Sequence, residues 1–300
     1  MSVEADDELT VLRIGGADAR AFLQGQLSND LHLLGPENPL LAALNSPQGR
    51  VVALLRLFQR ADTIAEIHAV LPRSMAATVI DRLRKYVLRS KVTLSVAEDF
   101  VVVPHLGKAF GERAAHSLDG DVSVLSFQQP EPRALLIGRS DAVSGLLARR
   151  QSSAASWNDW RRAQISAGEP QVYAATSERF VAQMLNLDLI DAVSFSKGCY
   201  TGQEIIVRTQ HLGRIKRRTV RLRTRGRAPE LGEKLAHGGQ TVAEVAELAA
   251  ARDGAYEVLA VVTMASLSGG APAVAGLELQ RLPLPYAVGD EVAPDAPFMA

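Results

Sequence analysis

The chain has 300 residues, 47% of them hydrophobic, and its 33 lysines and arginines balance its 33 aspartates and glutamates. Such a chain can bury a large core and divide into two or three domains, while a net charge of zero excludes an overall field that would steer it to nucleic acid. The acidic start at residues 1–8 is unlike a signal peptide, and no apolar run approaches the ~20 residues that cross a bilayer. We therefore expect a cytoplasmic protein without membrane contact.

The hydrophobic pattern of the first 90 residues predicts strands packed with two helices. One helix follows Asp18, its expected N-cap, and ends at the helix-breaking residues 28–30. The second helix, over 74–88, is amphipathic and places Tyr86 on its inward face. The strands are the apolar or alternating runs at residues 9–14, 40–44, 51–58 and 63–70, with a turn sequence at 45–49.

The middle of the chain continues this mixture. A helix opens at Ser156 in a capping box with Asp159 and carries Trp157 and Trp160 on one face. Because strands and helices alternate without a strict βαβ order, we expect an α+β fold rather than a doubly wound sheet. The expected strands are 92–96, 100–103, 122–127 and 134–137, and the expected helices lie near 108–116 and 141–149.

From residue 214 onward the pattern changes to short strand-like runs joined by turns rich in glycine and proline. This pattern predicts a small β-barrel or sandwich. The boundary falls just after residues 197–204 and places them near a domain junction, where ligand pockets are common. The runs lie at 217–223, 241–248, 258–264 and 277–282.

Residues 197–204, Lys-Gly-Cys-Tyr-Thr-Gly-Gln-Glu, contain Cys199, the only cysteine of the chain. A single thiol forms no disulfide framework, and the ammonium of Lys197, if close, would favour the thiolate. The neighbouring Gly198 and Gly202 would permit a tight surface turn. The alternative is a small buried hydrophobic residue, the usual environment of a free cysteine.

Other features have both a functional and a structural interpretation. Trp160 is either a core residue or a stacking platform for a flat heterocycle such as a pterin or a base. The basic stretch at 208–227 is either a solvated face or an anion site for a glutamate tail or phosphates. The six histidines and the cysteine show no metal-ligand spacing. A hydrolase pair of Cys199 with His211 lacks an identifiable acid partner.

At this point the motifs show a family resemblance. Residues 197–204 match the signature K-G-C-[FY]-x-G-Q-E of the YgfZ family, which is related to the glycine-cleavage aminomethyltransferase. Further blocks that resemble the family are residues 22–30, 47–50, 83–92, 183–188 and 283–286. The resemblance implies aminomethyltransferase-like folate-binding domains with ferredoxin-like α/β subdomains, and three domains around a central hole. These would be a discontinuous folate-binding core of residues 1–90 and 152–213, a ferredoxin-like subdomain of 91–151, and a C-terminal β-barrel of 214–300.

The resemblance also implies binding of tetrahydrofolate or a folate derivative, and a role in assembling or repairing iron–sulfur clusters in client enzymes, including those that thiomethylate tRNA. Cys199 and Lys197 fall on the family's functional pair. Trp160 falls on a tryptophan implicated in folate binding, and Leu9 on a second such aromatic position, where leucine cannot stack as an indole does. No permanently bound cluster is expected, because a stable one usually takes four protein thiolates. Further expected folate contacts are Tyr200, Gly202, Gln203, Glu204 and Arg208.

The chain departs from the related aminomethyltransferase at positions that carry its chemistry. Residues 49–54 contain no acid where the relative has an aspartate pair, and Cys199 stands in place of another aspartate. Ser166 stands where many members have a glutamate that holds the pterin ring, and Glu169 and Asp188 are the candidates to replace it.

We therefore expect an accessory protein that works with iron–sulfur client enzymes and cluster-assembly proteins, rather than an aminomethyltransferase. The alternatives are a folate-dependent one-carbon transferase and a tRNA-binding module that uses the basic face at 214–227.

Overall fold

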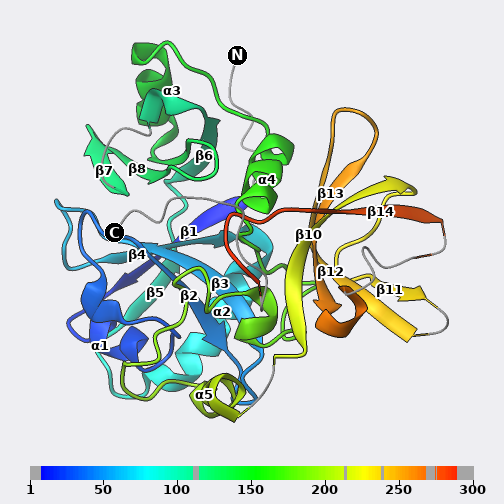
Figure 1. Ribbon diagram of the computed structural model, residues 1–300. Coiled ribbons are helices and arrows are strands. Elements are labelled where there is room, and N and C mark those ends of the chain that lie inside the picture. Colours follow the sequence, from blue (N-terminus) through cyan, green and yellow to red (C-terminus); the bar gives the residue numbers. More distant parts are fainter. Residues whose placement is uncertain are drawn as a thin grey trace.

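The computed structural model describes residues 8–110, 115–212, 215–237, 240–267, 274 and 276–288. Its strands form three antiparallel sheets (Figure 1). The expected mixture of helices and strands without a doubly wound sheet is therefore confirmed. Single turns of 3₁₀ helix lie at Leu31–Leu33, Lys108–Phe110, Ala182–Leu185 and Met264–Leu267.

The first sheet has the order β2-β3-β4-β1-β5. Strand β3 is buried at every position, because helices α1 (Ala19–Gln24) and α2 (Arg73–Val87) cover one face of the sheet and later parts of the chain cover the other. This double coverage explains why the sequence of β3 is an apolar run rather than an alternating one. The strands are β1 (Leu9–Gly15), β2 (Leu40–Asn45), β3 (Val51–Phe58), β4 (Ile67–Pro72) and β5 (Thr93–Val96).

The second sheet, with the order β6-β9-β8-β7, lies at the top of Figure 1. Helix α3 (Ser140–Arg149) covers one face through Val143 and Leu146. The other face packs against the first sheet in a cluster that includes Leu9 and Trp160. The strands are β6 (Val101–Leu106), β7 (His116–Asp119), β8 (Val122–Phe127) and β9 (Arg133–Gly138).

The third sheet contains the last five strands in the order β11-β12-β13-β10-β14. Among the described strands, β11 and β14 lie at opposite edges of this sheet, so the closed barrel stays a prediction. Strand β11 was not expected from the sequence. The strands are β10 (Arg217–Gly226), β11 (Lys234–His237), β12 (Gln240–Ala250), β13 (Tyr256–Thr263) and β14 (Leu277–Leu282).

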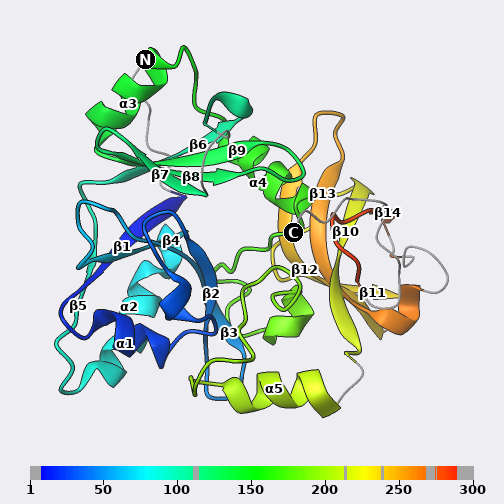
Figure 2. The ribbon, with the colours of Figure 1, turned by 60° about the vertical axis from the view of Figure 1, so that its left-hand side comes forward.

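The chain between the second and third sheets occupies the centre of the molecule. Figure 2 shows α4 (Trp157–Ser166) between the second and third sheets and the coil after it between the first and third sheets, with α5 (Gln203–Leu212) at the end of the coil. Val172, Leu185 and Ile206 from this segment share one apolar cluster with Leu54 of the first sheet and Val261 of the third. The central segment therefore supplies the core that joins these two sheets.

The structure confirms some of the predictions for individual residues and contradicts others. The N-cap of the predicted capping box is confirmed, because the Ser156 hydroxyl accepts a hydrogen bond from the backbone N–H of Asp159 at 3.1 Å, while the Asp159 carboxylate accepts from that hydroxyl at 2.9 Å. Asp18 does not cap α1 with its side chain, since its carboxylate accepts from the backbone N–H of Lys91 at 2.7 Å. Tyr86 is 39% exposed instead of inward.

The predicted helix near 108–116 is also wrong where it is described. Residues 108–110 form a 3₁₀ turn and His116 begins strand β7, while residues 111–114 lie outside the described ranges. The predicted strand at 63–70 begins only at Ile67.

Glu247 of β12 makes stability depend on pH. Its side chain is fully buried, and burial raises the pKa of its carboxyl to about 8, against the opposing effect of Arg161 and of a hydrogen bond from Tyr173. The folded protein then binds a proton that the unfolded chain releases near pH 4.5, so stability is greatest below that pH and falls as the pH rises to about 8.

We predict that Glu247→Gln removes this dependence. Urea denaturation at pH 5.5 and 8.5 should show the native protein losing about 3 kcal/mol more than the variant over that interval. Equal losses in the two proteins would show that Glu247 is ionised in the fold.

Candidate functional site

Cys199 lies in the coil that leads into α5, and its side chain is exposed and free. The residues on either side of the exposed pair Gly198-Cys199 are buried, Lys197 at 8% and Tyr200 at 6% exposure. The loop is thus held from both ends while the thiol faces outward. This position favours the surface-turn interpretation of Cys199 over the buried one.

Lys197 anchors the loop to the end of α1. Its ammonium donates hydrogen bonds to the backbone carbonyls of Gln24 at 2.7 Å, Leu27 at 2.8 Å and Asn29 at 2.7 Å. An ammonium has three N–H donors, so these three hydrogen bonds use all of them. The carbonyls at the end of a helix have no partner within the helix, and here Lys197 supplies one. Burial lowers the pKa of Lys197 to about 8, and the nearby carboxylate of Asp30 opposes this.

The geometry gives Lys197 a structural role that the sequence did not predict. In the described part of the chain no hydrogen bond joins Lys197 to Cys199, and the electrostatic pairing of the two stays a prediction. The ammonium also lies 5.1 Å from the centre of the Tyr200 ring. Burial raises the pKa of Tyr200 to about 12.

Gly202 closes the loop against the hairpin turn between β2 and β3. Its φ is +80°, and a Cβ at this position would lie 2.5 Å from the carbonyl oxygen of Ser46. The expected need for glycine is therefore confirmed at Gly202. At Gly198 it is wrong, because a Cβ there would meet nothing within 4 Å and φ is not positive.

The remaining predicted contacts of the signature lie on α5. Gln203 is its first residue, and the exposed Glu204 pairs with Arg208 one turn later at 2.8 Å. Exposed pairs of this kind contribute about 0.3–0.5 kcal/mol. The structure does not bring these side chains to the cavity described next, and their contact with folate stays a prediction.

A cavity of about 600 Å³ lies where the first sheet, the second sheet and the central segment meet. Its size is typical of small-molecule sites, which span about 300–1,000 Å³. Ser194, three residues before Lys197, lines it, whereas the signature residues 197–204 do not. The other lining residues that matter here are Asn29, Arg56, Phe127, Glu169 and Asp191.

An ionised carboxylate lies in the wall of this cavity. Glu169 accepts a hydrogen bond from Arg56 at 2.6 Å on one oxygen and from Arg133 at 2.7 Å on the other. Burial would raise the pKa of Glu169, but the two guanidinium groups outweigh it and the pKa is lowered. Both guanidinium groups also lie 4.9 Å from the centre of the Phe127 ring.

The cavity wall therefore offers an aromatic ring, the guanidinium group of Arg56 and a carboxylate with unused lone pairs. Such a set can hold a flat, polar heterocycle. Of the two candidates to replace Ser166, Glu169 lines the cavity. Asp188 does not, because it forms a two-point ion pair with Arg218 at 2.5 and 2.8 Å.

Trp160 and Leu9 lie beneath the cavity. They are 1% and 8% exposed and belong to one apolar cluster. Trp160 contacts the edge of Phe127 with the ring centres 5.9 Å apart. A fully buried indole offers no face to a ligand, so the aromatic ring at the cavity is Phe127. Sequence reasoning missed Phe127, Arg56 and Arg133, although an arginine within the apolar run of β3 was a usable signal.

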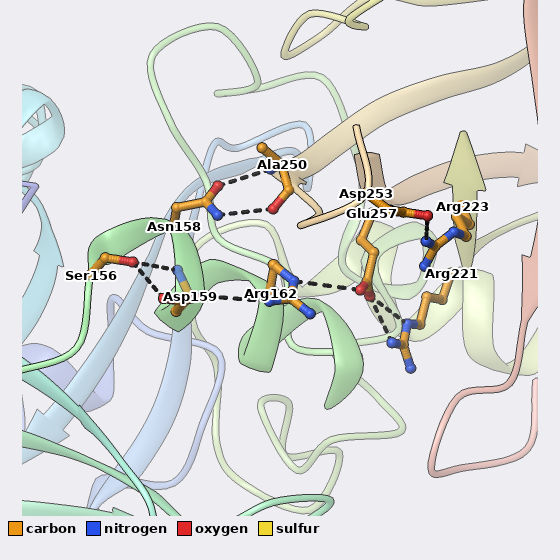
Figure 3. A network of polar contacts seen from close by, with 9 residues as sticks. All are labelled: Ser156, Asn158, Asp159, Arg162, Arg221, Arg223, Ala250, Asp253 and Glu257. Carbon is orange, nitrogen blue, oxygen red and sulfur yellow. Dashed lines mark hydrogen bonds and ion pairs between the residues drawn. The ribbon is translucent and has the colours of Figure 1, made fainter. Parts of the chain in front are cut away.

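The basic stretch at 208–227 is largely neutralised (Figure 3). Glu257 receives Arg221 at 2.7 Å and Arg162 at 3.6 Å, and Asp253 pairs with Arg223. The same holds for Arg217 with Glu244, Arg218 with Asp188, Arg225 with Asp253 and Arg227 with Glu233. These pairs favour the structural interpretation and remove most of the charge on which an RNA-binding face at 214–227 would depend; Arg214 lies outside the described residues.

The described ranges lack two further kinds of feature. No group of three or more histidine, cysteine, aspartate or glutamate side chains there could hold a metal ion. No helix within the same ranges has the length and apolar character to cross a membrane.

Comparison with known proteins reveals clear relatives. The chain is 34% identical over 247 residues to the tRNA-modifying protein YgfZ of Enterobacter sp. (strain 638). This alignment covers 76% of the present chain and 74% of the relative. It is 32% identical, with the same coverage, to proteins of that name from Escherichia coli O45:K1 and Shigella sonnei. No protein-family model matches the chain.

Among solved structures, the glycine cleavage system aminomethyltransferase T from Bartonella henselae is similar, with a TM-score of 0.64. The superposition covers 86% of this chain and 77% of that protein at 13% identity. At this identity the likeness establishes a shared fold.

We predict that Gly202→Ala lowers the free energy of unfolding by about 2 kcal/mol or more, because alanine is strained at positive φ and its Cβ would meet the Ser46 carbonyl. Gly198→Ala is the matched control and should change it by less than about 0.5 kcal/mol. Urea denaturation measures both, and similar losses in the two variants would contradict this account of the loop.

Proposed function

The chain belongs to the YgfZ family of tRNA-modifying proteins, and on this premise we propose that it is a cytoplasmic, tetrahydrofolate-binding accessory protein for iron–sulfur clusters. Its clients would include enzymes that thiomethylate tRNA, together with cluster-assembly proteins. The observation that carries the proposal is the exposed thiol of Cys199 on a loop fixed by Lys197 and Gly202. A fixed, accessible thiol can meet a partner protein without unfolding of the loop.

The number of thiols defines what Cys199 can do. A stable cluster usually takes four protein thiolates, so one cysteine needs ligands from a partner. The cluster is then cargo or substrate, handled during a transient contact. Aminomethyl transfer has less support, since residues 49–54 contain no acid and both oxygens of Glu169 accept from arginines.

The proposed folate site is the cavity at Glu169. The carboxylate can accept hydrogen bonds from the amino and ring N–H groups of a pterin, the contact for which Ser166 is unsuited. Phe127 supplies apolar contact, and Arg56 adds a positive charge to the cavity wall.

The proposal includes the division into three domains, the last a small barrel. It is supported by separate apolar clusters in the three sheets and by the packing of the central segment on the first sheet.

Folate binding is testable by tryptophan fluorescence, since Trp160 contacts Phe127. Tetrahydrofolate should quench the emission of the native protein, and Phe127→Ala should weaken the affinity about tenfold, or ~1.4 kcal/mol. Ile64→Ala, which removes an exposed apolar side chain outside the cavity, is the control. Absence of binding to the native protein in calorimetry would refute this site.

The role of the thiol is testable in cells that lack their own copy of the gene. Cys199→Ala should lower the fraction of thiomethylated adenosine in tRNA, measured by mass spectrometry of nucleosides, while the melting temperature stays unchanged. Ser196→Ala, an exposed neighbour, should restore full modification.

Lys197→Met should lower modification too, but with a lower melting temperature, because three carbonyls lose their donor. Full thiomethylation of tRNA in the Cys199→Ala strain would contradict the proposed role of the thiol.

A further inference from the structure

A cluster of exposed cations lies where α2 ends and the chain turns toward β5. Arg84, Lys85, Arg89 and Lys91 are all exposed within eight residues of sequence. Arg84 approaches Asp81 at 3.8 Å, and in the described chain the other three have no ion pair. The nearby carboxylate of Asp18, which accepts the backbone N–H of Lys91, and that of Asp81 offset only part of the charge of the four cations. The turn is therefore positively charged in a protein whose net charge is zero, in contrast to the paired arginines of β10.

The same turn exposes a strained apolar residue. Leu88 is 88% exposed and has φ 44° and ψ −103°, a conformation that a leucine rarely adopts. Two hydrogen bonds fix the turn, from Ser90 N–H to Val87 O at 2.7 Å and from Val92 N–H to Ser90 O at 3.0 Å. Strain of this kind concentrates at functional sites.

Beside Leu88 the surface is hollowed. The hollow has a volume of about 490 Å³, and apolar side chains share its lining with Arg84 and Thr93. Tyr86, on the last turn of α2, is 39% exposed. The hollow is lined by Arg84, Val87, Leu88, Val92, Thr93 and Leu94.

We propose that this turn, residues 84–94, is an RNA-binding surface. Phosphates contact the four cations, and an unstacked base packs against Leu88 and the hollow or on Tyr86. RNA fits better than an acidic protein, because lysine is depleted in protein–protein interfaces whereas clustered lysine and arginine are typical of phosphate-binding surfaces. This goes beyond the proposed function, in which tRNA is the substrate of client enzymes and need not touch this chain.

The test is fluorescence anisotropy with an unmodified, labelled tRNA transcript and the full chain between 50 and 200 mM salt. Lys85→Gln/Arg89→Gln should weaken binding at least fivefold at 100 mM salt. It should also reduce the slope of log affinity against log salt by about 1.5, since each lost phosphate contact removes about 0.7–0.9. The matched control is Arg223→Gln/Arg225→Gln, which removes the same charge from paired positions and should leave affinity within twofold.

Two additions make the result decisive. Leu88→Gly should weaken tRNA binding without lowering the melting temperature, because glycine adopts the backbone conformation without strain. Cys199→Ala should bind tRNA normally, so that failure of the iron–sulfur role leaves this measurement intact. The inference is overturned if the native protein does not bind tRNA, if the two double variants lose affinity equally, or if polyglutamate of matched charge competes as well as RNA does.

Discussion

The ion pairs of Glu169 with Arg56 and Arg133 fix the centre of this molecule. The carboxylate belongs to the central segment, and the two arginines belong to the first and second sheets. Arg133 is fully buried, so removal of its partner would leave an uncompensated charge in the interior, which is strongly destabilising. The sheets are therefore fixed relative to each other by charge as well as by apolar packing. The cavity lies beside these ion pairs.

The cysteine loop depends on the same central segment. Asn29 lines the cavity, accepts a hydrogen bond from Lys197 through its carbonyl, and donates to the carbonyl of Asp191 at 2.7 Å through its side chain. The cavity wall and the loop that carries Cys199 thus share a hydrogen-bonded residue. The ligand site and the thiol are separate in the fold, yet they are parts of one connected structure.

Local patterns predicted the fold well, and distant contacts escaped them. The apolar run of β3, the amphipathic α2 and the cap at Ser156 follow from residues close together in sequence, so their prediction held. Lys197 and Glu169 find their partners far along the chain, Gln24 being 173 residues from Lys197 and Arg56 113 residues from Glu169. The periodicity of apolar residues along the sequence does not indicate such distant pairings. Burial of Trp160 was undetermined for the same reason, since the apolar cluster around it draws on several distant stretches of the chain.

The long reach of Lys197 has a consequence for biosynthesis. Residues 24–29 leave the ribosome well before residue 197, so during most of translation the carbonyls at the end of α1 have only water as partner. The face of β3 that packs on the central segment is exposed for the same period. The strands of the amino-terminal sheet are therefore synthesised early, but the segment that covers one of its faces follows only much later. Chaperones that shield apolar surface have this interval in which to act on the nascent chain.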